Sequence, residues 1–490
     1  MRRRSNVDKK MEMKRRAYLR RMARFERMAD QPVLQGEEFK LFQAACDDKK
    51  NVGAFLNAYP EKIGSIPQLL EGSDLSDLNL NFTKFTEIKV PKNSLQRTIF
   101  TKSELERTDF SGFKLYKSNF TEAKLTGANF TGANLLGAYF DRACIEKVNF
   151  TGANLNAASF ENTDGIRMVN FQNATMLSFA IEDNFIDSCN FNGAGEILSL
   201  KDSEITDTDL SGLKVGLNDG LAGTTFVNCS LNGLIYEGTF NAEGSNPTFD
   251  GLNMNNAVLK NSTATVASFV DTKLMGVDFR GATLTKSDFT KAKLQNGIFS
   301  GAILDECDFD HTHITNANFS SANFTGATIT NPQNSSNVNF SEAVMKKVTF
   351  TSSVFANSNF SGVDFSGAKF QDVIFQQRSN LVNTIFTGAT LKNVDFSDSN
   401  LTGANLAGVN LTGATLSGAN LTNADLRNAD LTGVDLNNTI LKGIKTNKNT
   451  KMDMSFGRKL RKFITRKGTD SSSRIASRYV SKSWADEDLY

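Results

Sequence analysis

The sequence predicts an all-β solenoid, a chain that coils repeatedly and stacks its coils, and three observations support this. A large apolar residue recurs at every fifth position, as at Leu75, Leu80 and Phe85. A small residue, most often alanine, stands two positions before most of them. Polar residues and glycine fill the other positions. A period of five fits neither the 3.6-residue period of a helix nor the 2.0-residue period of a strand.

Each five-residue unit is predicted to be a very short strand followed by a corner. The large apolar residue, which we call the centre, and the small residue two before it lie on one face of an extended segment. Glycine in the rest of the unit supplies the positive φ that a tight turn requires. A chain that turns the same way at each corner must coil, and its coils stack by backbone hydrogen bonds about 4.8 Å apart.

The recurrence runs from Leu75 to Leu441 and is interrupted six times. The interruptions fall at 160–171, 191–200, 215–226, 236–249, 329–340 and 375–381. We expect the interruptions to leave the wall of the coil. We also expect the large centres to fill the lumen completely, because protein interiors are close-packed, and so to leave no channel or ligand cavity.

Units such as ANLTN, ADLRN and ANFTG resemble the pentapeptide-repeat family, whose consensus is A-(D/N)-L-x-x. The resemblance covers residues 75–445. It implies a rod-like, right-handed quadrilateral β-helix in which four of these units make one coil. Phe centres, which alternate with Leu or Ile between residues 95 and 160, should then stack along the axis. Asparagine ladders should run along the outside. The predicted pairs are Asn129 over Asn149, Asn134 over Asn154 and Asn400 over Asn420.

The two ends of the chain depart from the repeat and complete the predicted domain organisation. Residues 36–74 carry apolar side chains at helical spacing and predict a helical N-terminal cap, because an open stack exposes strand edges. Residues 1–35 predict a basic amphipathic helical extension. Its apolar stripe is Met11, Tyr18, Met22 and Phe25. Residues 446–490 predict a basic C-terminal extension with an amphipathic helix and a tail.

The net charge of +2 conceals an uneven distribution. Residues 1–30 hold 12 Lys or Arg against 4 Asp or Glu, and residues 446–490 hold 11 against 5. Residues 75–445 hold 28 against 37, and within them residues 161–260 hold 4 against 14. The irregular acidic stretch, residues 160–250, contains four of the six interruptions. Two interpretations stay open: sequence drift on an ordinary surface, or a docking surface for a basic partner.

Candidate partner-binding residues lie in these charged regions. The basic ends are suited to acidic protein surfaces, nucleic acid or anionic membrane, and the sequence does not choose among them. Helices that only cap the coils are the alternative, and the last residues are either a docking peptide or a disordered tail. The candidates are Arg15, Arg16, Arg20, Arg21, Arg458, Lys459, Arg461, Lys462, Trp484, Glu182, Asp183, Asp207 and Asp209.

Motifs that carry catalytic chemistry are missing from the sequence. We find no phosphate-binding glycine loop, nucleophile elbow or HExxH motif, so we expect no enzyme, no cofactor and no small-molecule substrate. The stretch DFDHTHI gives a weak metal candidate, with an ordinary polar surface as the alternative. Its residues are Asp308, Asp310, His311 and His313. Five cysteines without paired spacing indicate a reducing compartment.

The sequence therefore predicts a non-enzymatic scaffold, a rigid β-helical rod that mediates protein–protein interactions within a larger assembly through its basic ends and acidic irregular region. No secretory signal or membrane-spanning run is seen, so we expect a cytoplasmic location or a place in a large intracellular assembly. The family resemblance implies an alternative, a DNA mimic that binds and modulates a type II topoisomerase. A secreted effector or a virion structural subunit is a third possibility.

Overall fold

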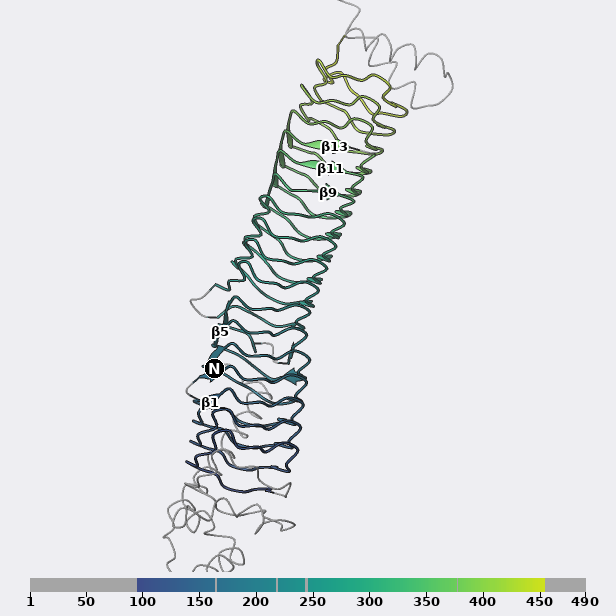
Figure 1. Cartoon of the computed structure of the whole chain (residues 1–490). Coiled ribbons are helices and arrows are strands. Elements are labelled where there is room, and N and C mark those ends of the chain that lie inside the picture. Colours follow the sequence, from purple (N-terminus) through teal and green to yellow (C-terminus); the bar gives the residue numbers. More distant parts are fainter. Residues whose placement is uncertain (1–94, 164, 217–218, 243–245, 377, 454–490) are drawn as a thin grey trace, which may run out of the picture. The chain divides into compact units, whose positions relative to one another are not determined.

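A computed structural model describes residues 95–453, except 164, 217–218, 243–245 and 377 (Figure 1). The chain divides into two units, Met1–Gly220 and Leu221–Tyr490. The described part of each unit is an all-β parallel solenoid, which confirms the predicted fold class. The predicted helical cap of residues 36–74 and the extension of residues 1–35 lie outside the described residues.

Short parallel strands and single-residue bridges build the described wall of the first unit. The strands are β1 (Ile145–Glu146), β2 (Ile166–Arg167), β3 (Phe185–Asp187), β4 (Glu196–Ile197), β5 (Glu204–Thr206) and β6 (Lys214–Val215). β1, β2, β3 and β5 are successive neighbours in one sheet, and β4 pairs with β6. Ile166 pairs with Ile145 on one side and Ile186 on the other. One turn of the coil therefore runs from Ile145 to Ile166, and the next runs from Ile166 to Ile186.

The second unit repeats this construction. Its described strands are β7 (Thr225–Val227), β8 (Thr328–Thr330), β9 (Ser335–Ser336), β10 (Thr349–Thr351), β11 (Val354–Ala356), β12 (Lys369–Gln371), β13 (Ile374–Gln376) and β14 (Thr390–Lys392). Two sheets run side by side along its wall, in the orders β14-β12-β10-β8 and β13-β11-β9. The described residues of both units contain no α-helix.

Every backbone N–H of the five-residue unit donates a hydrogen bond, as residues 128–132 illustrate. The first N–H closes the corner by donating to the carbonyl three residues back, and the second donates to the coil before it. The third and fifth donate to the coil after it. The fourth, that of Thr131, donates to the side-chain Oδ1 of Asn129 at 3.1 Å. Because an unpaired amide is costly, Asn or Asp before the centre completes the bonding of the unit.

The centres fill the lumen. We name the four faces of the first unit after the centres of its first described coil: the Leu95, Phe100, Leu105 and Phe110 faces. On the Phe100 face, Phe120 and Phe140 stack with their ring centroids 5.0 Å apart and their planes 7° apart. On the Phe110 face, Phe130 and Phe150 stack at 5.2 Å. All four rings are 0% exposed, so the predicted stacking is confirmed and the lumen is filled in these coils.

The corner residue, two positions after the centre, is left-handed whatever its type. Gly132 has φ of 65°, but Lys102 has 58° and the β-branched Val266 has 55°. Glycine takes this conformation without steric cost, and a β-branched residue is strained by it. The repeat geometry is strong enough to impose a left-handed corner on residues that disfavour it.

The expectation that the interruptions leave the wall is wrong at 160–171, 191–200 and 329–340. At 191–200, Ile197 is 0% exposed and pairs with Val215. At 160–171 the coil absorbs one extra residue, and Ile166 stays a centre with 0% exposure and in-register partners. At 329–340 the centre is Ser335, which is 4% exposed and pairs with Phe355. A parallel ladder needs only backbone groups in register, so it tolerates both a coil that is one residue longer and a small centre.

Candidate interaction surfaces

Asparagine ladders cover much of the outer wall. The three predicted pairs, Asn129 with Asn149, Asn134 with Asn154 and Asn400 with Asn420, are bridged in parallel and are confirmed. A longer ladder in the second unit links Asn318, Asn339, Asn359 and Asn380 by Nδ2-to-Oδ1 hydrogen bonds of 3.0, 3.2 and 3.0 Å. Because these asparagine side chains bond one another from coil to coil, we assign them a role in stabilising the wall.

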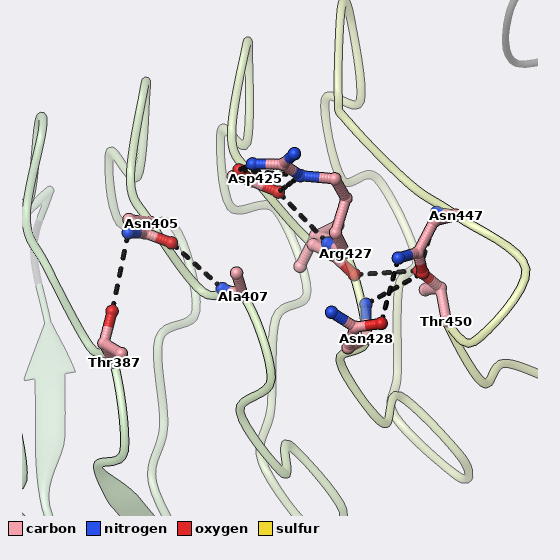
Figure 2. Close-up of polar contacts among 9 residues, drawn as sticks. Thr387, Asn405, Ala407, Asp425, Arg427, Asn428, Asn447 and Thr450 are labelled. Atoms are coloured by element: carbon pink, nitrogen blue, oxygen red, sulfur yellow. Dashed lines mark hydrogen bonds and ion pairs between the residues drawn. The ribbon is translucent and has the colours of Figure 1, made fainter.

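The same arrangement continues near the C-terminal end of the described chain (Figure 2). Asn405 Oδ1 accepts the N–H of Ala407 at 3.1 Å, as Asn129 does in its own unit. Asp425 accepts from the Arg427 guanidinium Nε at 2.9 Å, and this bond holds the pKa of the Asp425 carboxyl below its usual value. Asp425 and Arg427 satisfy each other in this surface ion pair, so they contribute little to the binding of a partner protein.

The wall extends past the predicted boundary at residue 445. Lys451 donates its N–H to the Ala429 carbonyl at 2.9 Å, and its Nζ pairs with Asp430 at 3.0 Å. Asn447 donates Nδ2 to Asn428 Oδ1 at 2.9 Å (Figure 2). The candidates Arg458, Lys459, Arg461, Lys462 and Trp484 lie outside the described residues, as do Arg15, Arg16, Arg20 and Arg21.

The four acidic candidates do not form a single patch. Glu182 and Asp183 lie next to each other on the Phe100 face and are exposed. Asp207 is exposed at a corner of the Leu105 face. Asp209 is half-buried on the Phe110 face, where its Oδ1 accepts the N–H of Ser211 at 3.0 Å. Asp209 therefore bonds a backbone amide of its own unit, as Asn129 does. Glu182 and Asp183 remain as the adjacent, exposed pair among the four candidates.

Part of the Phe100 face has buried side chains at positions that point away from the lumen. They are Ile99 (2% exposed), Asn119 (1%), Thr121 (1%), Tyr139 (8%) and Asp141 (3%). The equivalent outward side chains of Lys114, Lys124 and Asn134, on the two neighbouring faces, are exposed. The sequence did contain a signal for this face, because Ile99 and Tyr139 are apolar just before a centre, where the residue is usually polar.

Asp141 is the charged group of this buried set. Its Oδ1 accepts from the Ser159 hydroxyl at 2.5 Å and from the Glu161 N–H at 3.0 Å. Its Oδ2 and the Nδ2 of Asn119 are buried without a hydrogen-bond partner. Burial raises the pKa of the Asp141 carboxyl from 3.8 to about 6. Buried polar atoms without partners are rare in folded proteins, and two of those in the described wall lie together on this face, at Asn119 and Asp141.

The weak metal candidate is not assembled. Asp310 Oδ1 lies 2.8 Å from His311 Nδ1, and Asp308 and His313 bridge to other coils along the wall. Burial, with the nearby carboxylates of Asp288 and Asp310, raises the pKa of Asp308. Among the residues that the structure describes, no three His, Cys, Asp or Glu side chains are grouped so that they could hold a metal ion.

The cysteines take the positions expected of the repeat. Cys189, Cys229 and Cys307 are buried two residues before their centres, and Cys144 is exposed just before Ile145. Burial raises the pKa of the Cys189 and Cys307 thiols to about 12. Thiols with so high a pKa are poor nucleophiles, which indicates packing roles.

The fold and its wall define a class: parallel β-solenoids built from four five-residue units per coil. Three sequence models of one family match the chain. "Pentapeptide repeats (8 copies)" matches residues 118–156, 248–281, 299–331 and 404–443. "Pentapeptide repeat region" matches 334–406, and "Pentapeptide repeats (9 copies)" matches 269–313. The chain belongs to the pentapeptide-repeat family.

Solved structures similar to the chain include other pentapeptide-repeat proteins. HetL, from the cyanobacterium Nostoc sp. strain PCC 7120 and involved in regulation of heterocyst differentiation, is 26% identical over 38% of this chain and 86% of its own, with a TM-score of 0.18. Rfr23, from the cyanobacterium Cyanothece 51142, is 42% identical over 22% of this chain and 66% of its own, with a TM-score of 0.10.

QnrB1, a plasmid-mediated fluoroquinolone resistance protein, is 18% identical over 55% of this chain and 99% of its own, with a TM-score of 0.17. Comparison with curated proteins gave no match. With TM-scores this low the superpositions support no conclusion about function, so the family assignment stands on the repeat models. Within the described residues, no helix has the length and apolar character needed to cross a membrane.

Proposed function

We propose that the protein is a non-enzymatic scaffold, a rigid β-helical support that mediates protein–protein interactions within a larger assembly. One observation supports the proposal: the inward side chains, the backbone amides and the polar residue before the centre of each five-residue unit all make contacts within the wall. Inward side chains fill the lumen, backbone amides bond from coil to coil, and the polar residue before the centre bonds an amide. Such a wall favours rigid presentation of its outer surface over chemistry inside it.

The acidic stretch and the two basic ends are the proposed contact regions. Of the four basic residues within 161–260, two are already paired with carboxylates of the same stretch. Lys201 Nζ lies 3.2 Å from Asp219, and Lys214 Nζ lies 2.7 Å from Glu196. An excess of carboxylates therefore remains along this stretch, which suits a basic partner. The basic ends suit an acidic protein surface, nucleic acid or anionic membrane.

Truncation tests the proposal. We would compare partner capture by the full chain with capture by variants lacking residues 1–35 or 454–490, using cross-linking before lysis. The second cut begins at 454 because Lys451 still belongs to the wall. Loss of capture with one truncation, with unchanged far-UV circular dichroism, supports the scaffold. Undiminished capture by a variant lacking both ends, and by the same variant with Glu182→Lys and Asp183→Lys, contradicts it.

A second candidate is the DNA mimic, and the charge of the repeat body favours it. Residues 75–445 hold 37 Asp or Glu against 28 Lys or Arg, a net charge of −9. An acidic solenoid of this kind would compete with duplex DNA for a basic groove in a type II topoisomerase. The purified chain should then alter supercoiling by gyrase. Unchanged supercoiling at every protein concentration up to solubility would remove this candidate.

A further inference from the structure

The outward side chains on the Phe100 face are far more buried than the repeat alone explains. Ile99 stands just before its centre and is 2% exposed, whereas Ile303, at the same position of a unit in the second half of the chain, is 39% exposed. Tyr139 is a much larger side chain and is still only 8% exposed. The coil can leave an outward isoleucine open, so we attribute the burial of two large outward side chains, Ile99 and Tyr139, to a further segment that covers them.

The buried set also defines the chemistry of what covers it. Ile99 and Tyr139 present apolar surface, and the partnerless Asp141 Oδ2 requires a donor, which a cation supplies best. Carboxylates continue along the same face beyond Asp141, at Glu161, Glu182 and Asp183. A segment with an apolar stripe and many positive charges meets these requirements.

We propose that the Phe100 face, over Ile99, Asn119, Thr121, Tyr139 and Asp141, is the docking surface for the basic N-terminal segment of the same chain, residues 8–29. This segment holds nine Lys or Arg against three Asp or Glu, around the stripe of Met11, Tyr18, Met22 and Phe25. Its apolar residues pack on Ile99 and Tyr139. Its cations reach Asp141 and the carboxylates beyond it.

Length and connectivity allow this placement. Ile99 and Tyr139 are two coil steps apart, about 10 Å, and Glu182 lies two further steps along, about 20 Å from Ile99. A helix over residues 8–29 is about 33 Å long and spans the whole face. The chain between this segment and the wall, residues 30–94, is long enough to reach it. Residues 36–74 fit less well, because they hold seven Asp or Glu against four Lys or Arg and would meet carboxylates with like charge.

The inference goes beyond the proposed function and does not depend on it. If residues 8–29 dock on their own wall, Arg15, Arg16, Arg20 and Arg21 are engaged within the chain. An external partner is then left to the C-terminal basic extension and to exposed carboxylates such as Asp207. The covered face also becomes a site that a stronger basic competitor could uncover.

Thiol labelling of the full chain tests the docking. Tyr139→Cys is introduced into a Cys46→Ser background, and the native Cys144 serves as the internal reference, because it lies in the same coil, on the Leu105 face, and is exposed. We expect the thiol at 139 to react at least about tenfold more slowly than Cys144 in the full chain, as local protection slows access. Ile99→Cys is the second reporter, in case Tyr139→Cys itself loosens the face.

Two changes should expose the thiol at position 139 to the labelling reagent. Deletion of residues 1–35, or the charge reversal of Arg15, Arg16, Arg20 and Arg21 to Glu, should raise labelling of the 139 thiol by about tenfold without changing that of Cys144. Equal rates in the unmodified chain, or protection that survives both changes, would overturn the proposal. Protection that disappears on dilution would identify a second copy as the occupant and would also overturn it.

Discussion

Replacing Phe360 with alanine should cost the second unit about 4 to 5 kcal/mol of unfolding free energy. The ring is 0% exposed and stacks on Phe340 with centroids 4.9 Å apart. It also forms T-shaped contacts with Phe355 and Phe375, with ring centroids 5.1 Å and 5.2 Å apart. These neighbours are stiff aromatic rings, so they cannot move in to fill the vacated space, and the cavity cost is retained.

Urea denaturation followed by far-UV circular dichroism measures this loss, with hydrogen exchange to locate it. Solenoids lose coils locally, so exchange should quicken in the coils around Phe360 and stay unchanged around Leu284. Phe360→Leu is the matched control and should cost only about 1 to 2 kcal/mol, because Leu381 and Leu401 fill the same place in the next coils. A cost below about 1 kcal/mol for alanine would refute the close-packed lumen.

Three further changes probe the wall. Asn359→Ala removes hydrogen bonds to both ladder neighbours and to a backbone amide and should cost about 1 to 2 kcal/mol in the same urea assay. Gly403→Ala, at φ of 71° and with its new Cβ against Asn383 Oδ1, should lower the melting temperature more than Gly408→Ala, at φ of 73° with open space around it. Asp141 has a folded-state pKa of about 6 against an ordinary 3.8, so its ionisation destabilises the fold. Stability should fall by at most about 3 kcal/mol as pH rises from 3.8 to 6, and Asp141→Asn should remove that slope in urea melts across this range.

The sequence was sufficient to predict the inward half of the structure. A centre every five residues forces one inward side chain per corner. The stacking of Phe120 on Phe140 then follows from this period together with the four units per coil that the family resemblance implies. Ile166 and Ser335 were missed because register is fixed by backbone bonds. Neither an inserted residue nor a small centre breaks those bonds.

The contacts and exposure of the outward-pointing side chains were predictable from the sequence only in part. The pairing of Asn129 with Asn149 follows from the coil length, but its bond to the Thr131 amide depends on corner geometry that the period does not specify. Ile99 and Ile303 look alike in sequence, since each is an isoleucine just before a centre. Only the structure separates them, because Ile99 is 2% exposed and Ile303 is 39% exposed.

Stability and recognition are therefore carried by different residues of each unit. Inward positions such as Phe360 set the free energy of unfolding, while exposed outward positions such as Glu182 and Asp183 are free to change. The double variant Glu182→Lys and Asp183→Lys should shift unfolding free energy by no more than about 0.5 kcal/mol. It should still quicken thiol labelling at Tyr139→Cys, because it reverses the charge of carboxylates that lie beyond Asp141 on the same face and that the cations of residues 8–29 reach. A large loss of stability instead would mean that these carboxylates serve the wall, as Asp209 does.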